Sequence, residues 1–209
     1  EEKYNGYIVQ RIDLGECKTQ NIKVALANIK LDLDRCCVGL PQSKEVVLNR
    51  TDFIEFLRKS YEEKVQFLLL PEYYLPFVRK SGITVISGLQ YVTADGIAHN
   101  NVTIFPSIKS GRYRKYSSSC MFIREKNDYA PMEKEVLALK NLKCYDQEKA
   151  YYQVFQQYGI KYGIFLCYEF TDIMARALYK NEIDMLFAPE NNKDTGYFAS
   201  IIESTARDL

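Results

Sequence analysis

The segment from Ile160 to Glu169 reads IKYGIFLCYE, an apolar run that ends in a cysteine and an acidic residue. A helical pattern follows through Lys180, so Cys167 is expected at the turn between a buried strand and a helix. The free N–H groups and the positive end of a helix dipole lower the pKa of a nearby thiol and stabilise a developing oxyanion. The segment therefore predicts a reactive cysteine in an α/β chain, although a cysteine taken alone is more often a core residue.

Two segments upstream have the same form, an apolar or mixed run that ends in a side chain with acid–base chemistry. Residues 67–72 read FLLLPE and end at Glu72, and residues 111–115 read GRYRK and end at Lys115. Taken singly, Glu72 could cap a helix, and Lys115 could belong to a solvated basic face. Carboxylate, amine and thiol nevertheless follow one another in the order of a Glu-Lys-Cys hydrolase, and this combination favours the catalytic interpretation.

Composition limits the classes of protein that need consideration. The chain has 209 residues and is 47% hydrophobic, which suits one globular domain with a sizeable core. A formal net charge of +1 gives no overall field that would attract nucleic acid or an anionic membrane, and no apolar stretch approaches the roughly 20 residues of a membrane helix. The six cysteines lack the spacing of a secreted disulfide scaffold and form no CxxC pair, so we expect a cytoplasmic protein without a zinc site.

Apolar runs alternate with amphipathic segments along the chain, which indicates strands separated by helices. Strands are expected at residues 23–29, 65–70, 83–87, 160–166 and 185–188, and helices at 48–61, 133–142, 173–179 and 197–209. A hairpin is expected between residues 89–93 and 101–105, joined through the turn at 94–96. Apart from its helix, the region 117–149 reads as charged and less regular. The alternation predicts an α/β fold.

Several motifs together resemble the nitrilase (carbon–nitrogen hydrolase) superfamily. They are LLPEY at 69–73, YRK at 113–115, GIFLCYE at 163–169, AR at 175–176 and DMLFAP at 184–189. The resemblance implies a four-layer α-β-β-α sandwich over residues 23–209, with residues 1–22 as a leader or linker segment. The family continues into further strands, so we expect that C-terminal strands are missing from this chain. A second copy of the chain, in a homo-oligomer, or a further domain of the same polypeptide would then cover the open edge.

The resemblance also assigns roles to the residues in these motifs. Cys167 is the nucleophile that an unreactive amide or nitrile carbon requires, and Glu72 is the base that takes the proton from its thiol. Lys115 and the backbone N–H of Tyr168 stabilise the oxyanion. No metal and no organic cofactor is required for this chemistry.

Members of the family carry a second glutamate between the lysine and the cysteine, which orients the lysine. Glu133, in the segment YAPME at 129–133, is our choice for it, with Glu135 as the alternative. Asn191, Asn192 and Phe198 follow the strand at 185–188 and are candidates to line a substrate pocket. Ordinary loop and helix packing explains these last three residues equally well.

The leading hypothesis is a hydrolase of non-peptide carbon–nitrogen bonds in a small amide, carbamoyl compound or nitrile, acting through a thioester or thioimidate on Cys167. The alternative is a nitrilase-like binding or assembly module of a larger multidomain protein, for example one fused to a reverse transcriptase in a bacterial defence system. A pseudoenzyme that keeps the three residues for packing is a third reading, but a buried Glu-Lys pair is costly to retain without use. The basic, tyrosine-rich stretch 109–116 hints at nucleic acid, yet we expect no nucleic-acid partner for this domain alone and no membrane partner.

Overall fold

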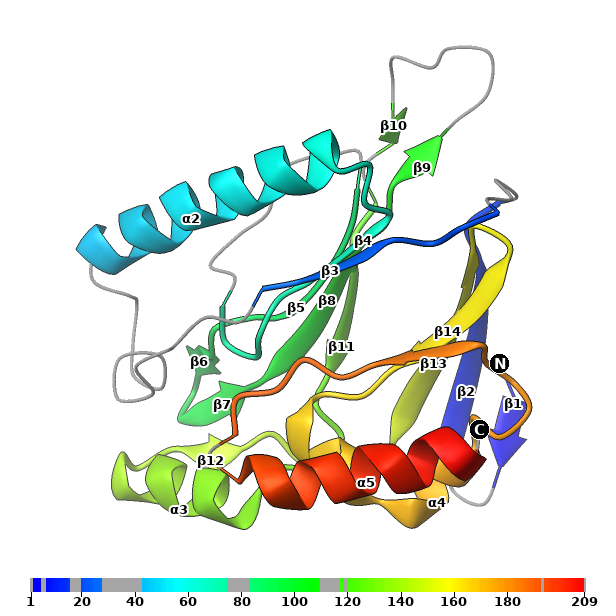
Figure 1. Cartoon of the computed structure of the whole chain (residues 1–209). Helices are drawn as coiled ribbons and strands as arrows, with labels where there is room; N and C mark the ends of the chain where they lie inside the picture. The colour runs from blue at the N-terminus through cyan, green and yellow to red at the C-terminus, as the bar shows by residue number, and fades with distance from the viewer. Residues whose placement is uncertain are drawn as a thin grey trace.

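The computed structural model describes residues 2–4, 7–15, 20–27, 43–74, 83–109, 117–118, 120–192 and 194–208. Two five-stranded sheets run through this part of the chain (Figure 1). The first has the order β1-β2-β13-β14-β15. Its strands are β1 Glu2–Tyr4, β2 Tyr7–Asp13, β13 Tyr151–Gln157, β14 Ile160–Ile164 and β15 Met185–Phe187.

The second sheet has the order β11-β8-β5-β4-β3. Its strands are β3 Val24–Leu26, β4 Phe67–Leu69, β5 Thr84–Gly88, β8 Asn101–Phe105 and β11 Phe122–Glu125. Two small sheets consist of β6 Val92–Ala94, β7 Ile97–His99 and β12 Lys143–Cys144, and of β9 Ile108–Lys109 and β10 Ser117–Ser118. The described helices are α2 Ser43–Glu62, α3 Pro131–Leu139, the 3₁₀ helix η1 Cys167–Thr171, α4 Ile173–Ala177 and α5 Thr195–Asp208.

The two large sheets pack face to face over an apolar core. Phe67 and Ile104 of the second sheet share this core with Phe155 and Phe187 of the first, and all four side chains are fully buried or nearly so. Burial of each such side chain stabilises the fold by about 1.5–3 kcal/mol. The inner faces of both sheets are therefore held against one another by the central layer of the molecule.

Helices cover the outer face of each large sheet (Figure 1). On the second sheet, Phe53 of α2 packs with Leu68 and Val85. On the first sheet, Ala175 of α4 and Phe198 of α5 belong to the cluster that also contains Tyr152 and Val154. These contacts give the layer order α-β-β-α that the sequence analysis expected. Among the described helices, none is both long and apolar enough to cross a bilayer.

The segment 1–22, expected as a leader or linker, contributes two strands to the first sheet. Strand β2 pairs in parallel with β13 from Ile8 to Asp13, and Val9 is buried in the outer core of this sheet. The strand β13 itself, in the middle of the sheet, was not expected from the sequence. Residues 2–4 and 7–13 are thus part of the sandwich, because β13 offers β2 a ladder of backbone partners and β2 in turn pairs with β1.

The expected hairpin between residues 89–93 and 101–105 is wrong. Asp95 and Gly96 both have positive φ angles, 50° and 74°, as a two-residue hairpin turn requires, and this turn joins β6 to β7. Strand β8 pairs instead with β5 and β11 on its two sides. The tight turn takes up the intervening residues and leaves β8 free to complete the second sheet.

Candidate active site

Side chains from three strands of the second sheet meet where these strands end, on one side of the sheet. Glu72 follows β4 and Lys126 follows β11, and the pairing directions make these two strands run the same way. Asn100 directly precedes β8, which runs in the opposite direction, so it lies at the same edge. Cys167 follows β14 of the facing sheet. The site therefore lies between the two sheets, at their common end.

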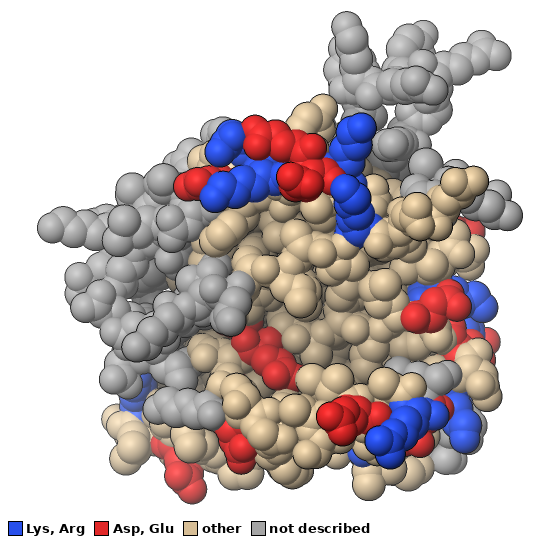
Figure 2. Space-filling model, viewed as in Figure 1, with Lys and Arg blue, Asp and Glu red and all other residues tan. Residues whose placement is uncertain are grey.

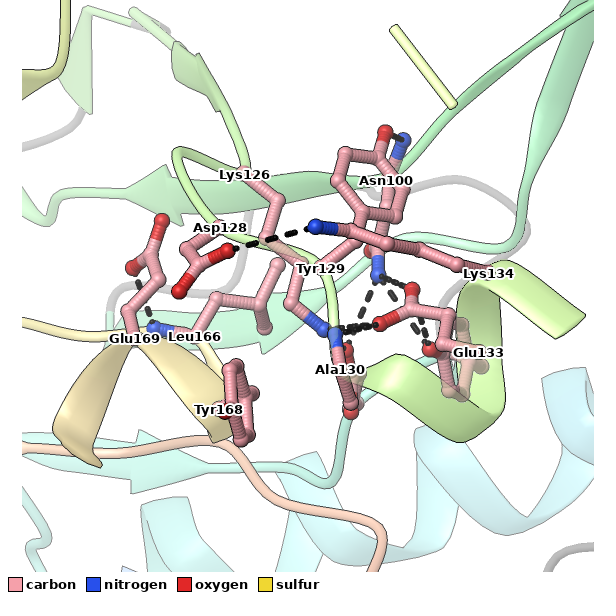
Figure 3. Close-up of polar contacts among 12 residues, drawn as sticks. Asn100, Lys126, Asp128, Tyr129, Ala130, Glu133, Lys134, Leu166, Tyr168 and Glu169 are labelled. Atoms are coloured by element: carbon pink, nitrogen blue, oxygen red, sulfur yellow. Dashed lines mark hydrogen bonds and ion pairs between the residues drawn. The ribbon is translucent and has the colours of Figure 1, made fainter. Parts of the chain in front are cut away.

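Lys126 is the central residue of this cluster. Its Nζ atom lies 2.7 Å from Glu133 Oε2 (Figure 3) and 2.8 Å from Glu72 Oε1, and its side chain has no solvent exposure. Burial alone would lower the pKa of Lys126, but the two carboxylates outweigh it and hold the pKa above its usual value. The site thus contains an ammonium group fixed between two carboxylates.

Glu133 is positioned by the start of α3. Pro131 is the first residue of this helix, and Glu133 at the third position accepts a hydrogen bond from the backbone N–H of Ala130 at 3.1 Å. A capping glutamate is normally exposed, but here its carboxylate also faces the interior (Figure 3). The local signal for a helix start therefore also places a catalytic-type side chain.

Further donors surround the carboxylate of Glu133. Its Oε1 accepts hydrogen bonds from Asn100 Nδ2 at 2.8 Å, from the hydroxyl of Tyr73 at 2.9 Å and from the hydroxyl of Tyr91. Burial opposes ionisation of Glu133, but Lys126 and these donors outweigh it, so the pKa of Glu133 lies below its usual value. Glu133 is accordingly a carboxylate held in its charged form 2.7 Å from the ammonium of Lys126.

Glu72 differs from Glu133 in its electrostatics. Its Oε1 accepts from Lys126 and, at 2.9 Å, from Asn100 Nδ2. Burial raises the pKa of Glu72 and the charge of Glu133 adds to the effect, although Lys126 acts against both. A carboxylate with a raised pKa is a stronger proton acceptor, as a general base requires. Gly88 makes room for it, because a Cβ atom there would lie 2.7 Å from the Cα of Glu72.

Cys167 occupies a sharp turn with a φ angle of 49°, in the left-handed region that non-glycine residues rarely adopt. Its backbone N–H donates to the carbonyl of Pro189 at 3.0 Å. Glu169 accepts from the N–H of Leu166 at 2.7 Å (Figure 3) and forms a bidentate pair with the buried guanidinium of Arg124, at 2.7 Å on each oxygen. The turn is thus fixed by the ion pair of Glu169 with Arg124, which connects it to strand β11 of the second sheet.

The thiol of Cys167 has a pKa above its usual value. Burial raises its pKa strongly, and Glu72 raises it further by its charge and by accepting a hydrogen bond from the thiol. Lys126 and the backbone N–H of Asn191 lower the pKa but do not outweigh these effects. The expectation of a lowered thiol pKa is therefore wrong, because burial beside a carboxylate outweighs the helix end.

The structure brings together Glu72, Glu133 and Cys167 of the residues chosen from the sequence, while Glu135 is exposed on α3. Lys115 lies outside the described residues. The amine at the site is that of Lys126, which sequence reasoning did not select. Lys126 follows the run FIRE at 122–125 as Glu72 follows its own strand, but two of these four residues are charged, so the run lacks the apolar signal of FLLL at 67–70.

The candidate pocket residues have different positions. Asn191 lies against the thiol through its backbone, and the side chain of Asn192 accepts a hydrogen bond from the N–H of Asp194 at 2.9 Å. Phe198 is packed in the outer core of the first sheet, so its assignment to the pocket is wrong, because α5 turns this ring toward the sheet. Tyr168, whose N–H was assigned to the oxyanion, is the second residue of η1.

The sequence matches no family model and no curated protein. Among solved structures, the chain is similar to an amidase from Nesterenkonia sp. AN1, with a TM-score of 0.61 and 14% identity over 89% of this chain and 74% of that one. That amidase belongs to the nitrilase superfamily, and in a mutant of that enzyme acrylamide adds to the active-site cysteine. A carbon–nitrogen hydrolase from Helicobacter pylori G27 is also similar, with a TM-score of 0.56 and 13% identity over 89% of this chain and 68% of that one. The chain has a nitrilase-like fold.

Proposed function

We propose that this protein hydrolyses a non-peptide carbon–nitrogen bond of a small molecule, namely an amide, a carbamoyl compound or a nitrile. The observation that carries the proposal is the arrangement of Cys167, Glu72 and Lys126. Burial and the charge of Glu72 raise the pKa of the Cys167 thiol, and the same carboxylate accepts from the buried ammonium of Lys126 at 2.8 Å. The similarity of the fold to an amidase and to a carbon–nitrogen hydrolase supports the same class of reaction.

The first step is attack on the substrate carbonyl. Glu72 takes the proton of the Cys167 thiol while the sulfur forms a bond to the carbonyl carbon, so no free thiolate accumulates. The developing oxyanion is stabilised by the ammonium of Lys126 and by the backbone N–H of Tyr168. Glu133 holds Lys126 charged and in place throughout, because it is an anion at 2.7 Å from the same nitrogen.

The later steps release ammonia or an amine and then regenerate the free enzyme. Glu72 returns its proton to the leaving nitrogen, the C–N bond breaks, and a thioester remains on Cys167. Glu72 then takes a proton from water, which attacks the thioester and releases a carboxylic acid and the thiol. A nitrile would pass through a thioimidate on the same sulfur. In this scheme Lys126 performs the role that the sequence analysis assigned to Lys115.

The test is ammonia release by the purified protein from a panel of primary amides, carbamoyl compounds and nitriles. We expect activity that disappears in Cys167→Ala, falls by about 10²–10⁴ in Glu72→Gln, and is retained in Cys120→Ser, whose thiol lies outside the site. Retention of activity in Cys167→Ala would refute the mechanism. Absence of turnover, together with alkylation of Cys167 no faster than that of Cys120 or Cys144, would favour the binding or assembly module.

A further inference from the structure

The segment that follows β15 contacts Cys167, the candidate nucleophile, through its backbone. The carbonyl of Pro189 accepts the backbone N–H of Cys167 at 3.0 Å, and the backbone N–H of Asn191 acts on the thiol itself. The side chain between these two contacts is that of Glu190. The backbone around Glu190 and Asn191 is therefore held close to the sulfur of Cys167.

Two polar atoms of this segment are buried and have no hydrogen-bond partner within the described part of the chain. They are Glu190 Oε1, an acceptor, and Asn191 Nδ2, a donor. Buried polar atoms without partners are rare and costly in folded proteins. An unused acceptor and an unused donor beside a nucleophile have the chemistry of groups that wait for a substrate.

Charge indicates which kind of substrate group suits Glu190. Lys126 is already shared by Glu72 and Glu133, so the ammonium of the site has its partners. Burial raises the pKa of Glu190 to about 7, and the charge of Glu72 adds to the effect. Figure 2 shows a small acidic patch within the mostly uncharged surface between α2 and α5. Glu190 therefore adds a third carboxyl group, close enough to be affected by the charge of Glu72, to a site where two carboxylates share one ammonium.

We propose that Glu190 is a specificity-determining residue that binds an ammonium or guanidinium group of the substrate, while Asn191 Nδ2 donates to an acceptor on the same molecule. This inference rests on the proposed function and names its substrate class: a small amide or carbamoyl compound that carries a basic nitrogen. A cation neutralises Glu190 and relieves its repulsion by Glu72. A substrate carboxylate would meet both of these anions and is selected against.

The first experiment measures charge selection at Cys167 without turnover. Three methanethiosulfonate reagents transfer an aminoethyl, a methyl or a sulfonatoethyl thiol group to the sulfur, with methanesulfinate as the leaving group. We expect Glu190→Gln to slow labelling of Cys167 by the aminoethyl reagent by about 10-fold, to leave the methyl reagent within about 2-fold, and to speed the sulfonatoethyl reagent. Glu203→Gln, an equal change of charge at an exposed position of α5, is the matched control.

The wild-type protein gives a second measurement that needs no variant. The ratio of aminoethyl to sulfonatoethyl labelling at Cys167 should exceed the ratio at Cys120 in the same sample by about 10-fold or more. Equal ratios at the two cysteines, or a ratio at Cys167 that Glu190→Gln leaves unchanged, would overturn the assignment of Glu190.

The second experiment compares 5-aminopentanamide, pentanamide and the monoamide of glutaric acid as substrates. We expect kcat/KM to be highest for the amino compound and to fall by about 10–100-fold for that compound alone in Glu190→Gln. Turnover of all three amides without discrimination would refute the role of Glu190 while the proposed function stands. Charge selection in labelling without turnover of these amides or of any amide, carbamoyl compound or nitrile in the wider panel would refute the proposed function and leave the cation site of Glu190 supported.

Discussion

Replacement of Lys126 by methionine tests the electrostatic core of the site most directly. Methionine keeps most of the aliphatic volume but removes the ammonium that lies 2.8 Å from Glu72 and 2.7 Å from Glu133. Since both carboxylate oxygens contact one nitrogen, they lie at most about 5.5 Å apart, and two charges at that distance repel by about 3 kcal/mol at an effective dielectric constant of 20. Loss of one partner from a buried ion pair typically costs about 3–5 kcal/mol, and we expect a loss of this size in the free energy of unfolding at pH 8.

The pH dependence of this loss has a defined sign. Without Lys126, the folded-state pKa values of Glu72 and Glu133 both rise above those of the unfolded chain, so protonation stabilises the folded variant. The difference between variant and wild type should therefore shrink as the pH falls from 8 to 5. Urea unfolding followed by circular dichroism at the two pH values measures this difference. Lys134→Met is the control, because Lys134 is exposed and its ion pair with Asp128 is long, at 3.7 Å, so its loss should cost little. A loss at pH 8 within about 1 kcal/mol of the control would refute the reasoning.

Three further predictions follow from individual contacts. Gly88→Ala places a Cβ atom 2.7 Å from the Cα of Glu72, so ammonia release should fall by about 10-fold or more along with the melting temperature, whereas Gly196→Ala, with its nearest neighbour at 3.9 Å, should change neither. Glu190→Gln should gain stability relative to wild type as the pH rises from 5 to 8, because a folded pKa of about 7 means that ionisation of Glu190 opposes folding in this range. Partial exposure limits the gain to about 1–2 kcal/mol, and urea midpoints at the two pH values check it. Glu169→Gln leaves a buried guanidinium without its counter-ion, so the free energy of unfolding should fall by about 3–5 kcal/mol, as measured by urea titration; a loss below 1 kcal/mol would contradict the pair.

The strands that carry Glu72 and Cys167 could be predicted from the sequence because each is an apolar run with a polar side chain at its end. Lys126 could not be found in the same way. Its strand β11 contains Arg124, a charged residue that is buried only because Glu169, 45 residues further along the chain, supplies the counter-ion. Periodicity reads neighbours along the chain, so a strand whose burial depends on a distant partner resembles an exposed segment.

The arrangement of the strands was predictable only in part. The layers follow from apolar faces, which the sequence displays, but the pairing of β2 with β13 joins residues about 140 positions apart. The orphaned atoms of Glu190 and Asn191 were equally invisible, because the absence of a partner is a property of the folded surroundings. The sequence indicated Asn191 only by its place after a strand.

The tie between Arg124 and Glu169 also joins the two halves of the chemistry. The nucleophile belongs to one sheet, whereas its base and the ammonium belong to the other, so neither sheet alone holds a working set of groups. The distance across which the proton moves is consequently set by how the central aromatic layer fills the gap between the sheets. Substitutions in that layer, such as at Phe67, would change the distance between the two sheets and with it the distance over which the proton is transferred. The reactivity of the Cys167 thiol therefore reports the separation of the two sheets. It should be lost when the packing between the sheets loosens, before the protein unfolds as a whole.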